Sequence, residues 1–256
     1  MATYKKRGYK PKTKAEKVEA IEDNSTTAEV FNTLDQGASK AEEWVIKNQK
    51  YIFIIVGLAA VLILGYLGYN KYIQEPKESN AMNDMYQAQQ YFDRAVNDPA
   101  KDSLYTLSLN GGEGKFGMLD IINEYGGTNA GNLAKYYAGM AYLNLKDYQN
   151  AITYLSDFSG GTDEFKILAQ GGIGDAFAQL NQLDDALDYY DKAVTIGNND
   201  YLTSMFLFKA GTTALELNQN NKALGYFNRI KNDFPNAVGP AHIDVFIGKA
   251  EAAMKN

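Results

Sequence analysis

This chain is poor in histidine and cysteine, two residue types that often serve in nucleophilic and metal chemistry. The chain has one histidine, His242, and no cysteine. Without cysteine, thiolate nucleophiles, thiolate zinc sites and disulfide exchange are excluded. A Ser-His-Asp arrangement or a histidine metal site would have to use His242, which follows Pro240 and is expected to face solvent at the start of the last helix. We therefore predict no catalytic residues and no metal site.

Two other patterns resemble functional sites. The carboxylates of Asp184, Asp185 and Asp188 are expected to hydrate the exposed face of a helix. The segment Gly112–Gly117 fits G-x-G-x-x-G, a dinucleotide fingerprint that requires a βαβ unit around it. Because the chain that follows has a helical pattern, we expect a flexible loop between two helices there, and no cofactor.

One uncharged run, Tyr51 to Tyr69, is long enough to cross a bilayer. As a helix it would be about 28 Å long, close to the thickness of the hydrocarbon layer. A cleaved signal peptide is disfavoured, because fifty residues precede the run and no small-x-small pair follows it. We predict a transmembrane helix over 40–75, with its span at 51–69. Aromatic and basic residues around the span are expected to lie at the membrane interface, namely Trp44, Lys50, Tyr51, Tyr66, Tyr69 and Lys71.

The distribution of charge predicts an orientation. Residues 1–50 hold ten basic and eight acidic residues, and the rest of the chain holds 15 basic and 23 acidic. By the positive-inside rule, the N-terminus lies in the cytoplasm and the long C-terminal part lies across the membrane. The acidic C-terminal part also disfavours nucleic acid as a partner.

The leader, 1–39, is basic at its start and has a capping box at Thr26–Glu29. We expect a short amphipathic helix there, with apolar positions Val30, Phe31, Leu34 and Ala38 and an interruption at Gly37. A second helix is expected to begin near Lys40 and to end at Pro76. The leader is interpreted either as a topology signal with a helix on the membrane surface or as a segment that contacts anionic lipid, ribosomal RNA or a cytoplasmic partner.

The C-terminal part contains an internal repeat. When Gly139, Gly174 and Gly211 are aligned, other positions come into register at spacings of 35 and 37 residues. The shared columns are Tyr142, Phe177 and Ala214, then Ala151, Ala186 and Ala223, then Leu155, Tyr190 and Phe227. We expect the glycine and alanine columns to let two helices approach closely, while the larger residues fill the space around them.

This pattern resembles the tetratricopeptide repeat, a helical hairpin of about 34 residues. The units would begin near Asn132, Ile167 and Ser204, and Pro235 would end the third. Two positions depart from the family pattern: Lys135 replaces a large apolar residue and Ala214 replaces an aromatic. The predicted fold class is all-α, with one N-terminal transmembrane helix followed by a tetratricopeptide-repeat solenoid.

The remaining helices are placed around these repeats. Residues 76–131 are predicted to form a degenerate helical hairpin, with helices at Asn80–Val96 and Phe116–Tyr125 and an inserted loop between them. Residues 132–256 would hold the three repeats and a capping helix at about Ala241–Lys255.

The repeat register predicts a partner-binding groove lined by the first helix of each unit. The lining would be mostly apolar and would suit an apolar helix or an unfolded apolar segment. Alternatively, some of these residues pack against the upstream hairpin or another chain. The predicted positions are Leu133, Tyr136, Met140, Leu143, Leu168, Gly171, Asp175, Ala178, Met205, Phe208, Thr212 and Leu215.

The layout of leader, span and repeats is similar to that of the YfgM-type family of bacterial inner-membrane proteins. The resemblance implies an inner-membrane protein with a periplasmic C-terminal domain, ancillary to the Sec translocon. Its implied partners are Sec translocon subunits, a periplasmic peptidyl-prolyl-isomerase-type chaperone, nascent exported chains and membrane lipid. A scaffold for cell-wall synthesis or an outer-membrane secretion machine is the main alternative, and an enzyme built on the repeats is a second.

Overall fold

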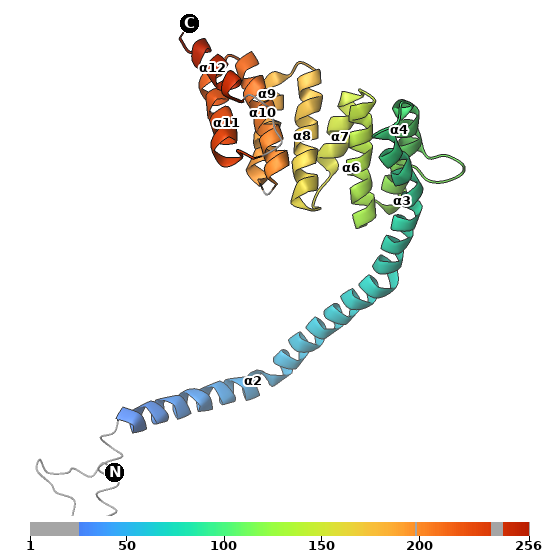
Figure 1. The fold of residues 1–256 in the computed structure, drawn as a ribbon. Coiled ribbons are helices and arrows are strands. Elements are labelled where there is room, and N and C mark those ends of the chain that lie inside the picture. Colours follow the sequence, from blue (N-terminus) through green and yellow to red (C-terminus); the bar gives the residue numbers. More distant parts are fainter. Residues whose placement is uncertain (1–25, 198, 237–242, 256) are drawn as a thin grey trace, which may run out of the picture. The chain divides into compact units, whose positions relative to one another are not determined.

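The computed structural model describes residues 26–197, 199–236 and 243–255, and of residues 26–40 only the backbone. Regular secondary structure in these ranges is helical, apart from one isolated antiparallel bridge between Gly112 and Lys115. The predicted all-α class is therefore confirmed. The chain divides into two units, one ending at Tyr69 and the other beginning at Asn70 (Figure 1).

The first unit contains helix α2, Thr26–Tyr69. Within the described residues, the chain has one helix long and apolar enough to cross a membrane, and its most apolar window has a mean hydropathy of 2.5. The side chains of this window are exposed, as Leu62 illustrates at 73%. The helix is a candidate transmembrane span by both length and composition.

Helix α2 corrects the prediction of a break at Gly37, because it runs through that residue without interruption. A lone glycine costs a helix only about 1 kcal/mol relative to alanine, and the good helix formers around it compensate. The basic start of the leader, residues 1–24, lies outside the described residues, as do the side chains of the predicted amphipathic face.

The second unit begins with a π-helical turn, η1 (Asn70–Gln74), and helix α3 (Glu75–Ala95). Pro76 is the second residue of α3, and the residues before it are already helical, so the helical backbone continues through Pro76 and does not end there as predicted. The widened π turn directly before it is a known way to accommodate such a local mismatch. Helix α3 also starts earlier than the predicted Asn80.

The predicted inserted loop is wrong in its main part. Residues Lys101–Asn110 form helix α4, which buries Leu104, Tyr105 and Leu109 against α3 and its neighbours. Apolar residues at helical spacing explain this helix. The chain then turns through the Gly112–Lys115 bridge into α5, Met118–Tyr125, at the position predicted for the second helix of the hairpin.

Three helical hairpins follow in the predicted order, and Figure 1 shows them as successive pairs. A last helix, α12 (Ile243–Ala253), packs on the third pair; the predicted start of this helix, Ala241, lies outside the described residues. The pairs are α6 (Asn129–Asn144) with α7 (Tyr148–Asp157), α8 (Asp163–Gln179) with α9 (Leu183–Ile196), and α10 (Asp200–Glu216) with α11 (Asn220–Asp233).

The aligned glycines make the close approach that the repeat pattern predicts. A Cβ atom added to Gly139, Gly174 or Gly211 would lie 2.5, 2.6 or 2.4 Å from a side-chain atom of the second helix of the same pair. The atoms concerned belong to Leu155, Tyr190 and Phe227, the aligned large residues. The alanines at 151, 186 and 223 are fully buried. Each pair is thus held by a small-to-large contact that recurs from repeat to repeat.

The turns inside the pairs also repeat. Lys146, Asn181 and Asn218 adopt positive φ angles of 65°, 58° and 58°, one in each turn between first and second helix. Asparagine tolerates this left-handed conformation better than most residues. The two asparagines therefore fit their positions better than the lysine does.

Candidate functional site

A groove runs over the first helices of the three repeats. It encloses a cavity of about 540 Å³, which we call the repeat groove. Its lining comes from α6, α8, α9 and α10, so no single repeat forms it. The lining residues are Leu143, Asp175, Ala178, Gln179, Leu183, Tyr190, Lys209, Thr212, Thr213 and Glu216.

Asp175 is at the centre of the polar contacts in the repeat groove. Both of its carboxylate oxygens accept hydrogen bonds from the Lys209 ammonium at 2.7 Å. The Tyr190 hydroxyl donates to Asp175 Oδ1 at 2.8 Å. Burial, and then the neighbouring Asp175 carboxylate, raise the pKa of Tyr190, so this hydroxyl stays a donor at neutral pH. The groove floor thus offers a partly exposed pair of opposite charges.

Several of the predicted groove residues do line this cavity. Leu143, Asp175, Ala178 and Thr212 are among its lining residues. The polar side chains of Gln179, Lys209, Thr213 and Glu216 lie beside them. The groove is accordingly more polar than the mostly apolar surface that we predicted.

The other predicted positions serve packing within and between the helices. Tyr136 is 6% exposed, and its ring meets those of Phe158 and Phe165 at centroid distances of 5.6 and 4.9 Å. Phe208 packs on the rings of Phe227 and Phe246. The Phe206 ring occupies the space that a Cβ atom at Gly171 would need. The remaining positions are half-buried against the core, namely Leu133, Met140, Leu168, Met205 and Leu215.

Lys209 is the main groove residue that the sequence analysis missed. It is the only charged residue in the central part of α10, between Leu202 and Leu215, and its neighbours there are mostly apolar. An isolated charge in an otherwise apolar helical segment is a signal for a buried partner or a functional surface. Applied to α10, this criterion would have identified Lys209.

The three aspartates and the glycine-rich segment considered for chemistry are not among the residues that line the repeat groove. Asp184, Asp185 and Asp188 are exposed on α9. Gly117 caps α5, and its N–H donates to the Asp120 carboxylate at 3.0 Å, so the glycine-rich segment forms a turn between two helices. Within the described ranges, no group of three or more His, Asp or Glu side chains could hold a metal ion. His242 lies outside these ranges.

The predicted membrane-interface residues lie on α2 and in η1. Trp44, Tyr51, Tyr66 and Tyr69 are exposed on α2, at 53 to 68%. Lys50 is exposed on the same helix, and Lys71 in η1 forms an ion pair with Glu75 at 2.7 Å.

All three helical pairs match models of known protein families. Residues 133–159 and 206–237 match a tetratricopeptide repeat model, and residues 169–200 match a second model of the same description. These ranges correspond to α6–α7, α10–α11 and α8–α9. No curated protein matches the chain. The repeat type is therefore shown, and such repeats bind protein partners in general.

Proposed function

We propose that this protein is a membrane-anchored adaptor that binds another polypeptide in the repeat groove. The observation that carries the proposal is the groove itself, which crosses three repeats and presents the Asp175–Lys209 pair between apolar residues. Stacked helical repeats commonly use such a surface to hold a peptide or a helix. The proposal includes no catalytic step.

The lining defines the kind of segment that would bind. Leu143, Ala178 and Leu183 offer apolar contacts, and Asp175, Lys209 and Glu216 offer charged ones. An amphipathic helix or a mixed polar and apolar segment complements this lining better than a purely apolar one, because unpaired polar groups would otherwise be desolvated.

We further propose that α2 anchors the protein in the bacterial inner membrane. The N-terminus would lie in the cytoplasm and the repeats in the periplasm, in accordance with the excess of basic residues in the leader. The exposed aromatic residues Trp44, Tyr51, Tyr66 and Tyr69, with Lys50 and Lys71, would lie at the interfaces. A periplasm-specific reporter fused after Asn256 should be active, and activity only of a cytosol-specific reporter would contradict this orientation.

In the cell, the adaptor would work at the exit of the Sec translocon, beside a periplasmic chaperone of the peptidyl-prolyl isomerase type. Support comes from the similarity in layout to the YfgM-type family. Tethering raises the effective concentration of the repeats near emerging chains, so weak contacts would suffice. The alternative is a scaffold for another envelope assembly, in cell-wall synthesis or outer-membrane secretion.

Photo-crosslinking from inside the repeat groove tests these proposals. A photoreactive residue at Leu143 or Thr212 would face a bound segment, whereas one at the exposed Asp185 on α9 is the matched control. Tyr136 and Phe208 are unsuitable, because Tyr136 is buried and the partly buried Phe208 ring packs on Phe246. Capture of translocon subunits, the chaperone or nascent chains at Leu143 and Thr212 supports the export role.

Other outcomes of the same experiment separate the alternatives. Capture of cell-wall synthesis or secretion proteins alone would favour the scaffold. Equal products from the groove and from Asp185 would contradict binding in the repeat groove.

A further inference from the structure

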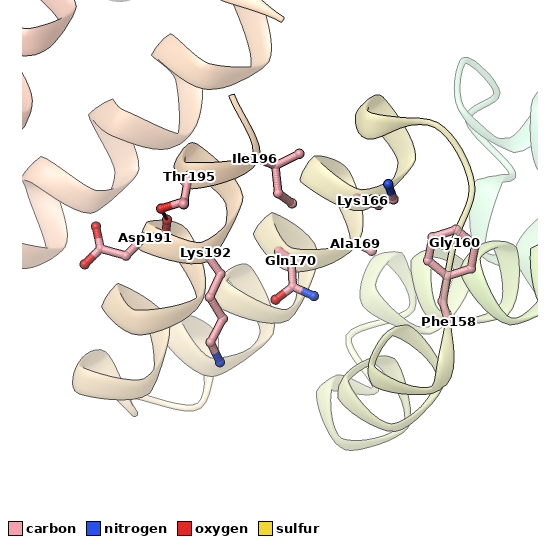
Figure 2. Close-up of a pocket in the computed structure, with 9 residues that line it drawn as sticks. All are labelled: Phe158, Gly160, Lys166, Ala169, Gln170, Asp191, Lys192, Thr195 and Ile196. Carbon is pink, nitrogen blue, oxygen red and sulfur yellow. Dashed lines mark hydrogen bonds between the residues drawn. The ribbon is translucent and has the colours of Figure 1, made fainter. Parts of the chain in front are cut away.

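A second pocket lies between repeats one and two and is separate from the repeat groove. It is open to solvent, has a volume of about 500 Å³ and is lined by the segment after α7, the first half of α8 and the last turns of α9. Figure 2 shows its lining side chains, with Asp191, Lys192, Thr195 and Ile196 on one side and Phe158 on the other. We call it the junction pocket.

The floor of the junction pocket is apolar and firmly packed. Ala169 is 2% exposed, and the Phe158 ring packs on Tyr136 and Phe165 at centroid distances of 5.6 and 6.4 Å. Ile196 packs against the neighbouring core. Because these contacts do not involve a ligand, the cavity is formed in advance, as is usual for small-molecule sites.

Two lysines also line the junction pocket, and they differ in their partners. Lys166 forms an ion pair with Asp163 at 3.1 Å. The Lys192 ammonium lies 3.7 Å from the centre of the Tyr189 ring, and no ion pair involves it among the residues that the structure describes. The ring stabilises the cation without neutralising it. Lys192 therefore leaves a positive charge at the pocket.

The remaining polar groups leave this charge available. The Asp191 carboxylate accepts a hydrogen bond from the Tyr226 hydroxyl at 2.6 Å. Figure 2 shows the Asp191 carboxylate pointing away from Lys192 and Gln170. The Gln170 amide lies on the α8 side of the pocket and can donate a hydrogen bond. An ammonium and an amide N–H together suit a carboxylate oxygen pair.

We propose that the junction pocket binds a small organic acid, with its apolar body against Phe158, Ala169 and Ile196 and its carboxylate at Lys192 and Gln170. The volume is within the range of about 300–1,000 Å³ typical of small-ligand sites. The pocket is confined to residues 158–196 at one repeat junction, whereas a peptide groove runs across several repeats. This binding is independent of whether the repeat groove holds a polypeptide.

A disulfide-capture experiment on the intact protein in detergent tests this proposal. The chain has no cysteine, so Thr195→Cys places a single thiol at the pocket, and Ser156→Cys places the control thiol on an exposed position of α7. Each variant is equilibrated with two disulfide probes of the same shape, one ending in 4-phenylbutanoate and the other in 4-phenylbutanamide. Intact-mass spectrometry then gives the ratio of the two adducts.

The thiol at position 195 should capture the acid over the amide on the order of fivefold more, the effect of one partly exposed ion pair. The ratio at position 156 should be about one. Adding Lys192→Gln should remove the preference, whereas adding Lys146→Gln, a change in a distant turn, should leave it unchanged. Equal capture of acid and amide at position 195, or a preference that survives Lys192→Gln, would overturn the proposal.

Competition identifies the source of the carboxylate. Free 4-phenylbutanoate should block capture at lower concentration than the peptide Gly-Gly-Phe with a free C-terminus. If the peptide competes at the lower concentration, the pocket binds the C-terminus of a polypeptide, and the assignment to a free acid is wrong.

Discussion

Asp175 and Lys209 join repeats two and three across the floor of the repeat groove. The carboxylate, on α8, accepts two hydrogen bonds of 2.7 Å from the ammonium, on α10. The two side chains are 29 and 35% exposed, so they are accessible to a partner while they link the repeats. The same ion pair therefore contributes to stability and to the binding surface.

A double-mutant cycle with Asp175→Asn and Lys209→Gln should measure this link. We expect a coupling free energy of about 0.5–1 kcal/mol in urea unfolding, because the pair is partly screened by solvent. The exposed pair Arg229–Asp233, at 3.7 Å within one helix, is the control and should give no more than about 0.5 kcal/mol. A coupling near zero for Asp175 and Lys209 would mean that the repeats do not depend on this contact.

Two glycine substitutions should have opposite effects on thermal stability. A Cβ atom at Gly211 would lie 2.4 Å from the Phe227 ring, whereas one at Gly225 on α11 would meet no atom within 4 Å. Gly211→Ala should therefore destabilise by about 1–3 kcal/mol through overpacking. Gly225→Ala should stabilise by about 0.5–1 kcal/mol, because alanine favours the helix. Equal melting temperatures for the two variants would contradict the close packing at Gly211.

Ionisation of the Tyr136 hydroxyl should lower the free energy of unfolding at alkaline pH. Burial raises the pKa of Tyr136 to about 12, from an ordinary value of 10.0. The folded protein therefore holds this proton more tightly than the unfolded chain does. The resulting stabilisation is complete below about pH 10 and is lost as the pH rises toward 12, by about 1 kcal/mol per pH unit.

Urea unfolding of the wild type and of Tyr136→Phe at pH 9 and pH 11 checks this origin. The variant keeps the ring contacts with Phe158 and Phe165 but has no proton to lose. It should lose less stability than the wild type between the two pH values. An identical loss in both proteins would assign the effect to other groups.

Glu78 should stabilise the start of the first repeat. The Glu78 carboxylate, on α3, accepts hydrogen bonds from two backbone N–H groups at the N-terminus of α6. The donors are Asn129 at 2.7 Å and Ala130 at 2.8 Å. Glu78→Ala should cost about 1–2 kcal/mol, because it removes a charged cap from a helix N-terminus. Hydrogen exchange at residues 129 and 130 should become faster. Glu75→Ala, which removes only the exposed pair with Lys71, is the control and should change neither measurement appreciably.

The repeats could be predicted from the sequence because their signal is local and recurs three times. Gly174 and Tyr190 are sixteen residues apart in the same pattern as Gly139 with Leu155 and Gly211 with Phe227, and each pair is in contact. Helix breakers were less informative. Gly37 lies inside α2, where neighbouring helix formers compensate for it, and Pro76 lies in the first turn of α3, directly after a π turn.

The groove was harder to predict because repeat register does not determine which side chains remain accessible. Tyr136 and Phe208 occupy groove columns of the repeat, yet both rings turn into aromatic clusters formed with residues outside those columns. The pairing of Lys209 with Asp175 connects residues of different repeats, so no pattern within one repeat could reveal it. The junction pocket depends in the same way on the packing between repeats one and two.

The contacts of α3 with α6 have a mechanical consequence. Gln74 donates to the carbonyl oxygen of Gly127 at 2.9 Å, and Glu78 caps the helix that follows. A pulling force that arrives along the backbone at Asn70 would load these bonds before it reached repeats two and three. Helix α3 would therefore separate from the repeats before the Asp175–Lys209 contact was loaded.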